Sequence, residues 1–101
     1  MKLFITLGLL LGLSVGMASA ETVELTAYTH TGGVMANGEY PYVGAVASND
    51  YPLGTTVYIY GQPYVVADRM ASGIHGVIDV FVDSYDEAIA FGRQTAEVCT
   101  A

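Results

Sequence analysis

A series of short segments rich in β-branched and aromatic residues is the feature that most constrains the fold of this chain. The segments alternate apolar and polar positions or are briefly apolar, and glycine, proline or polar residues end them, which is typical of strands. The predicted strands are residues 22–29, 44–48, 55–61, 63–68, 76–82 and 95–100, with GQP at 61–63 as a tight turn. Six short strands in a small domain favour a β-barrel.

One helix is predicted to interrupt the strands, in the stretch SYDEAIAFG at residues 84–92. Ser84 is a suitable N-cap, and Glu87 three residues later completes a capping box. Gly92 marks the point where the helix ends. The sequence therefore predicts a mainly β fold with one short helix.

The first 20 residues are typical of a secretory signal peptide. Lys2 supplies a positive charge, LFITLGLLLGLSVGM follows it, and ASA at 18–20 is a small-residue cleavage site. A transmembrane anchor is the competing interpretation, but the apolar stretch is short for a membrane span. We therefore expect cleavage near Ala20, no stable membrane anchor, and one secreted or periplasmic domain that comprises residues 21–101.

The charge of the chain argues against nucleic acid as a partner. The formal net charge is −7, and removal of Lys2 with the signal peptide would leave only Arg69 and Arg93 against ten Asp and Glu residues. A domain this acidic repels a phosphate backbone. We expect a monomer that binds no nucleic acid.

Cofactor, metal and nucleophile chemistry find little support in the sequence. Cys99 is the only cysteine, so no internal disulfide can form, and a half-buried structural thiol is its expected role. His30 and His75 lack the spacing of a metal site, and no GxSxG or phosphate-loop motif is present. We expect neither a metal nor a cofactor.

Two aspartates stand apart because they lie in apolar runs with few other charges nearby. Asp68 ends the run YVVAD, and Asp79 lies eleven positions later within GVIDVFV. Strand alternation puts Asp79 on the same face as Phe81 and opposite the aliphatic residues. A structural role, in which each carboxylate accepts hydrogen bonds from loop amides or pairs with Arg69, and a catalytic role both fit this spacing.

Several stretches resemble a known family in their order along the chain. TAYT, GAVASNDYPLGTTVYIYG, YVVADR and GIHGVIDVFVDSYDEAIAFGRQTAEV are similar to the 3D domain, a family named for three aspartates. The resemblance covers residues 26–98. It implies a six-stranded double-psi β-barrel that is related to the catalytic domain of membrane-bound lytic transglycosylase A and to small secreted cell-wall lytic proteins.

The resemblance also implies an activity and roles for residues. Family members cleave peptidoglycan between N-acetylmuramic acid and N-acetylglucosamine and leave a 1,6-anhydro sugar, which would make Asp79 the general acid and base and Asp68 its partner. The third family aspartate aligns with Asn49, and the adjacent Asp50 is taken as its counterpart. The candidate substrate-binding residues, in or beside the loops near these aspartates, are Tyr28, Thr29, Tyr51, Gly73, His75 and Gly76.

Three functions stay open at this stage. A lytic transglycosylase is favoured, because burial beside Phe81 and a nearby like charge would keep Asp79 protonated, as a glycosidic leaving group requires. A non-catalytic glycan-binding module of the same fold is the second, since a fold does not fix an activity. A glycoside hydrolase, in which Asp68 activates water, is the third.

Overall fold

The computed structural model describes residues 19–100 of the 101-residue chain. The predicted signal peptide therefore lies almost entirely outside the described residues. Within the described part, no helix has the length and apolar character needed to cross a membrane.

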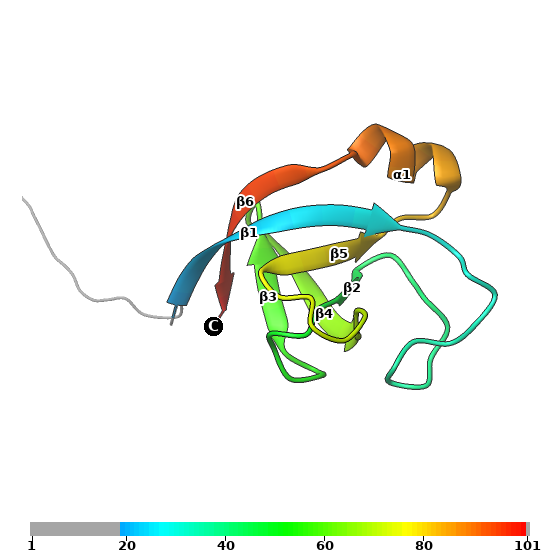
Figure 1. The fold of residues 1–101 in the computed structure, drawn as a ribbon, viewed down its shortest axis with the longest axis horizontal. Helices are drawn as coiled ribbons and strands as arrows, with labels where there is room; N and C mark the ends of the chain where they lie inside the picture. The colour runs from blue at the N-terminus through cyan, green and yellow to red at the C-terminus, as the bar shows by residue number, and fades with distance from the viewer. Residues whose placement is uncertain (1–18, 101) are drawn as a thin grey trace, which may run out of the picture.

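The described residues form a closed barrel with one short helix on its outside (Figure 1). The strands are β1 (Ser19–Tyr28), β2 (Ala45–Ala47), β3 (Thr56–Ile59), β4 (Gln62–Asp68), β5 (Val77–Phe81) and β6 (Gln94–Thr100), and the helix is α1 (Tyr85–Phe91). Around the barrel the strands follow the order β1-β5-β2-β4-β3-β6, and β6 closes it by pairing with β1.

The barrel mixes parallel and antiparallel pairs in a symmetric way. β1 pairs in parallel with β5, and β2 pairs in parallel with β4, while the other four neighbouring pairs are antiparallel. Exchanging β1, β2 and β3 for β4, β5 and β6 leaves every neighbour relation unchanged. The mainly β, six-stranded barrel with one short helix that the sequence predicted is confirmed.

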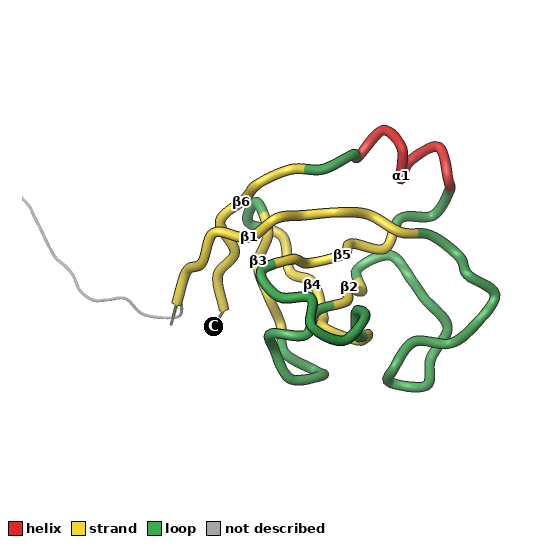
Figure 2. Tube along the Cα trace, viewed as in Figure 1, coloured by secondary structure: helices red, strands yellow, loops and turns green. Residues whose placement is uncertain are grey.

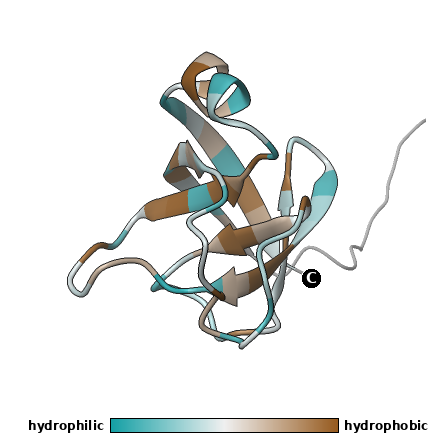
Figure 3. Ribbon diagram, turned by 90° about the vertical axis from the view of Figure 1, so that its right-hand side faces the viewer, coloured by the Kyte–Doolittle hydropathy of each residue, from teal (hydrophilic) through white to brown (hydrophobic). Residues whose placement is uncertain are grey.

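The barrel interior is filled by aliphatic side chains that recur at every second position of the strands. Val23 and Leu25 of β1 and Ile78 and Val80 of β5 are buried there, with side chains from the other four strands. Figure 3 shows that hydrophobic stretches, coloured brown, recur along the strands. Because side chains alternate across a strand, the residue between Ile78 and Val80 must face outward, and that residue is Asp79.

The helix begins and ends where the sequence predicted. The Ser84 hydroxyl accepts a hydrogen bond from the Glu87 amide at 3.1 Å, and the Glu87 carboxylate accepts one from the Asp83 amide at 3.4 Å. Gly92 adopts a positive φ of 63° at the C-cap, a conformation that favours glycine. Helix α1 lies beside β1, and Phe91 at its end packs against the barrel core.

The prediction of a GQP turn between the third and fourth strands is wrong. Ile59 pairs with Gln62, so the two turn residues are Tyr60 and Gly61, and Pro63 lies within β4. Tyr60 and Gly61 have φ values of 52° and 78°. A type I′ hairpin turn, which fits the strand twist, needs positive φ at both central positions, and proline cannot adopt a positive φ.

Tyr60 should be a site where a substitution stabilises the protein. Among the described residues it is the only non-glycine residue with a positive φ. Asparagine tolerates this conformation better than tyrosine by about 1–2 kcal/mol, which outweighs the exposed hydrogen bond that the Tyr60 hydroxyl donates to Gln94, so Tyr60→Asn should raise the free energy of unfolding by up to about 1 kcal/mol. Chemical denaturation would measure the change, with Tyr40→Asn in an exposed loop as a control that has little effect. A loss of stability in Tyr60→Asn would contradict this account of the turn.

Candidate functional site

A pocket of about 300 Å³ lies where β1 and β4 end, beside the middle of β5, and both central aspartates line it. Asp68 comes from the end of β4 and Asp79 from the middle of β5. The remaining walls come from β2 and from two loops, residues 29–44 and 69–76. Figure 2 shows the longer of these loops extending from the barrel on the side where β1 ends. The barrel thus brings together the two acids that the sequence singled out.

Asp79 occupies a position fixed by strand pairing on both sides. It pairs with Thr26 of β1 and with Ala47 of β2, and the Thr26 hydroxyl donates a hydrogen bond to its Oδ1 atom at 2.8 Å. Its side chain is half-buried. Burial raises the pKa of Asp79, the negative charge of Asp68 raises it further, and the hydrogen bond from Thr26 partly offsets both. The site therefore favours the protonated form of this carboxyl group.

Asp68 is held differently, by backbone amides of two loops. Its Oδ1 atom accepts hydrogen bonds from the amides of Ala36 and Arg69, both at 2.8 Å. The Arg69 guanidinium turns away to the carbonyl oxygens of Ser48 and Tyr51, each at 2.7 Å. The loop-organising role considered from the sequence is thus present for Asp68. It is not seen for Asp79, whose bond comes from a side chain.

The loop at residues 30–43 forms one wall of the pocket because a buried methionine anchors it. Met35 is 2% exposed and packs with Ala45 and Ala67 in a small second core. The backbone amide of Asn37 also donates a hydrogen bond to the Ala67 carbonyl oxygen at 3.1 Å. These contacts place Val34 and Pro41 of the loop against the pocket. Sequence reasoning missed this anchor, although one long apolar side chain in a polar loop was a usable signal.

Tyr28 is the last residue of β1 and also lines the pocket. Its ring packs edge-on against Phe81, with the ring centres 5.5 Å apart. Burial, followed by the negative charges of Asp68 and Asp79, raises the pKa of Tyr28 to about 12. The hydroxyl is buried, and its contact with Asp68 falls short of hydrogen-bond geometry. The neighbouring Thr29 hydroxyl is also buried without a hydrogen-bond partner, but Thr29 does not line the pocket.

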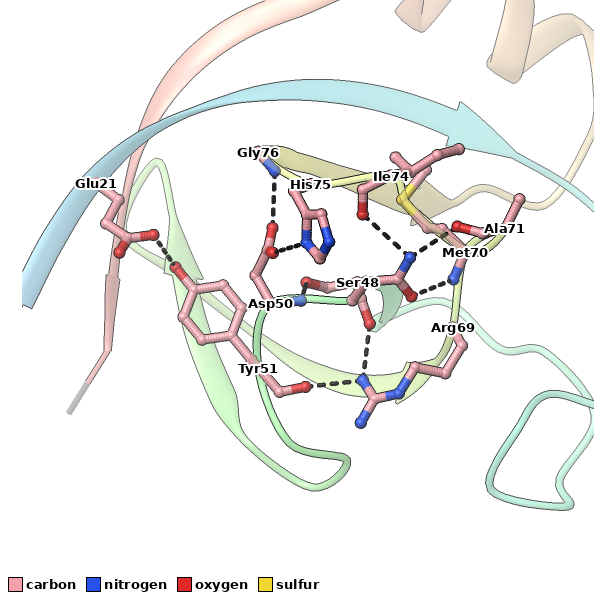
Figure 4. A network of polar contacts seen from close by, with 11 residues as sticks. Glu21, Ser48, Asp50, Tyr51, Arg69, Met70, Ala71, Ile74, His75 and Gly76 are labelled. Atoms are coloured by element: carbon pink, nitrogen blue, oxygen red, sulfur yellow. Dashed lines mark hydrogen bonds and ion pairs between the residues drawn. The ribbon is translucent and has the colours of Figure 1, made fainter.

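Asp50 belongs to a second polar cluster that does not line the pocket (Figure 4). Its Oδ1 atom lies 2.6 Å from His75 Nδ1, and its Oδ2 atom accepts a hydrogen bond from the Gly76 amide at 2.8 Å. The hydrogen bond with His75 is the main cause that lowers the pKa of Asp50. Three sequence candidates, Asp50, His75 and Gly76, therefore come together at the start of β5, apart from the pair in the pocket. Nearby, the Tyr51 hydroxyl donates to the Glu21 carboxylate at 2.9 Å.

Asn49, which the sequence resemblance aligns with the third aspartate of the 3D domain, fastens the loop that carries Gly73. Its side-chain nitrogen donates to the carbonyl oxygens of Ala71 and Ile74, at 2.8 and 3.0 Å, and its oxygen accepts from the Met70 amide at 3.0 Å. Met70 and Ala71 line the pocket. The amide group is suited to this position because it both donates and accepts.

Metal binding finds no support in the part of the chain that the structure describes. No three His, Cys, Asp or Glu side chains come together there as a metal site requires. His30, the other histidine considered from the sequence, contacts Asp83 at 3.0 Å and packs edge-on against Phe81.

Replacing Asn49 by aspartate should destabilise the protein in a pH-dependent way. A carboxylate would lose both donated bonds and face two carbonyl oxygens, which should cost about 1–3 kcal/mol at neutral pH. The fold would disfavour the charged form and raise the pKa of the new carboxyl group, so part of the stability lost at neutral pH should return on acidification, when the protonated carboxyl can donate to one of the two carbonyl oxygens. Thermal unfolding of Asn49→Asp at pH 4 and pH 7 measures this, with exposed Gln62→Glu as the control. Equal stability of variant and wild type at pH 7 would refute the role of Asn49.

Comparison with known proteins finds a relative whose name refers to the cell wall. No protein-family model matches it. The chain is 32% identical over 81 residues to "Putative cell wall shaping protein YabE" of Bacillus subtilis (strain 168). The match covers 79% of this chain and 20% of that protein, so the chain spans about a fifth of the relative's length. The likeness is consistent with a cell-wall-related role.

Proposed function

We propose that this protein is a lytic transglycosylase of peptidoglycan, with Asp79 as general acid and base and Asp68 as its partner. The observation that carries the proposal is the placement of these two carboxyl groups in one pocket, where burial and the charge of Asp68 raise the pKa of Asp79. Groups with perturbed pKa values that gather in a pocket are the usual mark of acid–base chemistry. The similarity to a cell wall shaping protein supports a cell-wall glycan as the substrate.

The proposed reaction needs only one proton carrier. Protonated Asp79 gives its proton to the glycosidic oxygen between N-acetylmuramic acid and N-acetylglucosamine, and the bond from that oxygen to the muramic acid C1 atom breaks. The Asp79 carboxylate then takes the proton of the muramic acid C6 hydroxyl while the C6 oxygen forms a bond to C1. The product is a 1,6-anhydro sugar, water is not consumed, and Asp79 ends protonated as it began.

Asp68 would act through its negative charge. Two backbone amides fix its carboxylate in the pocket wall, so the charge needs no rearrangement when positive charge develops on the sugar ring. Asp50 lies outside the pocket, and in this proposal it acts indirectly, because it holds His75 and Gly76 where β5 begins.

The size of the pocket suits one part of a glycan strand. A volume of about 300 Å³ is at the lower end of small-molecule sites. The rest of a polymer would lie on the outside, where Tyr40 and Tyr42 on either side of Pro41 are exposed and present aromatic rings.

A non-catalytic glycan-binding module is the second candidate, and one observation favours it. Asp68 is held by loop amides, as a purely structural carboxylate would be. The three activities leave different products when purified peptidoglycan is digested and analysed by mass spectrometry. A lytic transglycosylase releases anhydro ends, a hydrolase releases reducing ends, and a binding module releases no fragments.

We also propose that the protein is exported and processed after Ala20. The positive charge, apolar stretch and small-residue site at residues 1–20 support this. The exported protein should therefore begin at Glu21, and the intact mass of material recovered outside the cytoplasm would test it. Recovery of exported protein that still carries residues 1–20 would contradict the proposal.

Asp79→Asn should abolish anhydro-product release and also stabilise the fold at neutral pH. Asparagine can still accept the Thr26 hydrogen bond but cannot carry the proton. Because the fold raises the pKa of Asp79, the charged carboxylate of the wild type costs stability, and its removal should raise the melting temperature. This gain should vanish at acidic pH, where the carboxyl group is protonated in both the folded and the unfolded state. For the same reason wild-type activity should fall as the pH rises through this raised pKa. Muropeptide analysis and thermal unfolding measure these effects.

Asp86→Asn provides the matched control for Asp79→Asn. Asp86 is an exposed acid in the first turn of α1, so its replacement should leave product release unchanged. Near wild-type release of anhydro products by Asp79→Asn would return Asp79 to a structural role. A fall in the melting temperature of Asp79→Asn at neutral pH would show that the charged Asp79 carboxylate stabilises the fold.

A further inference from the structure

The Tyr28 hydroxyl is a buried polar group without a satisfactory partner. The hydroxyl oxygen is shielded from solvent, and no acceptor lies around it in hydrogen-bond geometry. Buried hydroxyl groups are nearly always paired in folded proteins, and the exceptions often mark functional sites. The position of this unpaired hydroxyl beside the pocket therefore indicates a functional role for it.

The surroundings of Tyr28 limit what its hydroxyl can do. Strand pairing places Tyr28 beside Phe81, and the edge-on contact of the two rings at 5.5 Å fixes the tyrosine ring. Two acceptors share the pocket with it, Asp68 and Asp79. Both carboxylates are near enough for their charges to act on the hydroxyl. A hydroxyl can turn its hydrogen by rotation about one bond, so one fixed ring can serve two acceptors in turn.

Other charged or titratable groups near this site are engaged elsewhere or exposed. Arg69 lines the pocket, but its guanidinium binds the carbonyl oxygens of Ser48 and Tyr51. His30 contacts Phe81 from the solvent side and pairs with exposed Asp83. Tyr42 is near enough to affect Tyr28, and it is 40% exposed. The described residues contain no lysine.

We propose that the Tyr28 hydroxyl is a hydrogen-bond donor shared by Asp68 and Asp79. The hydroxyl turns toward whichever carboxyl group is charged, and Tyr28 is therefore a positioning residue of this pair. While Asp79 carries its proton, the hydroxyl would turn toward Asp68, which is the carboxylate nearest to giving it a hydrogen bond. When Asp79 becomes charged, two carboxylates share one pocket, and a hydrogen bond from the neutral hydroxyl would offset part of their repulsion. The pKa of Tyr28, near 12, keeps the hydroxyl protonated throughout.

This inference rests on the proposed function only for its catalytic meaning, because the shared hydrogen bond can be measured without any substrate. The full domain labelled with ¹³C-aspartate would be titrated, and the side-chain carboxyl signals of Asp68 and Asp79 would be followed by NMR. Because the groups interact, the titration gives apparent pKa values of the pair. The variant is Tyr28→Phe, and the matched control is Tyr85→Phe, which removes the same hydroxyl from an exposed ring on α1.

Removal of a donor that stabilises a carboxylate favours the protonated form. Tyr28→Phe should therefore raise the apparent pKa values of the pair by about one pH unit, while Tyr85→Phe should leave them unchanged. Unchanged values in a folded Tyr28→Phe variant would overturn the proposal. A gain in melting temperature together with an unchanged titration would show that the hydroxyl has no partner at all.

A second measurement uses the wild-type protein and does not depend on the folding of a variant. The ¹³C signal of the Tyr28 ring carbon that bears the hydroxyl should shift at the same pH values as the two carboxyl groups, and the Tyr85 signal should not. A Tyr28 signal without these inflections would also overturn the proposal.

The activity assay separates this inference from the proposed function. If wild-type protein releases anhydro products, Tyr28→Phe should move the fall in activity to higher pH by the same amount as the titration. If wild-type protein releases none, the proposed function fails, while the titration still decides whether Tyr28 is shared by the two aspartates.

Discussion

The pairing of β5 with β1 on one side and β2 on the other is the interaction on which the site depends. Ile78 and Val80 of β5 are held in the barrel core, which forces Asp79 outward between Thr26 and Ala47. The core therefore fixes the backbone position from which this carboxyl group projects, and the Thr26 hydroxyl then binds its Oδ1 atom. Aliphatic packing in a small barrel thus provides the rigidity that a catalytic group needs.

The three candidate aspartates differ in what surrounds them, and this difference separates their roles. Asp50 is stabilised as an anion by His75 and the Gly76 amide, and Asp68 is held by two loop amides. Asp79 has one hydroxyl donor and is penalised by burial and by the charge of Asp68. Two acids in one pocket with different environments are a common basis for acid–base chemistry. Because the pKa of Asp79 is raised, its charged form costs stability, as would be expected if Asp79 has the proposed role.

The pocket also depends on loops that are fastened to the barrel by specific contacts. Met35 anchors residues 30–43, and the Asn49 side chain fastens residues 70–74. Asp68 helps to fasten both loops, because its carboxylate accepts a hydrogen bond from the backbone amide of Ala36 in one loop and of Arg69 in the other. A residue that organises the pocket and a residue that contributes charge to it can therefore be the same aspartate.

The sequence by itself determined the six strands, the capped helix and the outward direction of Asp79, because strand periodicity and helix caps are local signals carried by neighbouring residues. It misplaced the hairpin turn, since the positive φ of Tyr60 has no signature in a tyrosine. Only the tertiary structure decided that Asp68 and Asp79 share a pocket with Tyr28, while Asp50 faces His75 instead. These relations depend on barrel closure, which brings strands distant in sequence side by side, and a pattern of neighbouring residues cannot encode the distances between them.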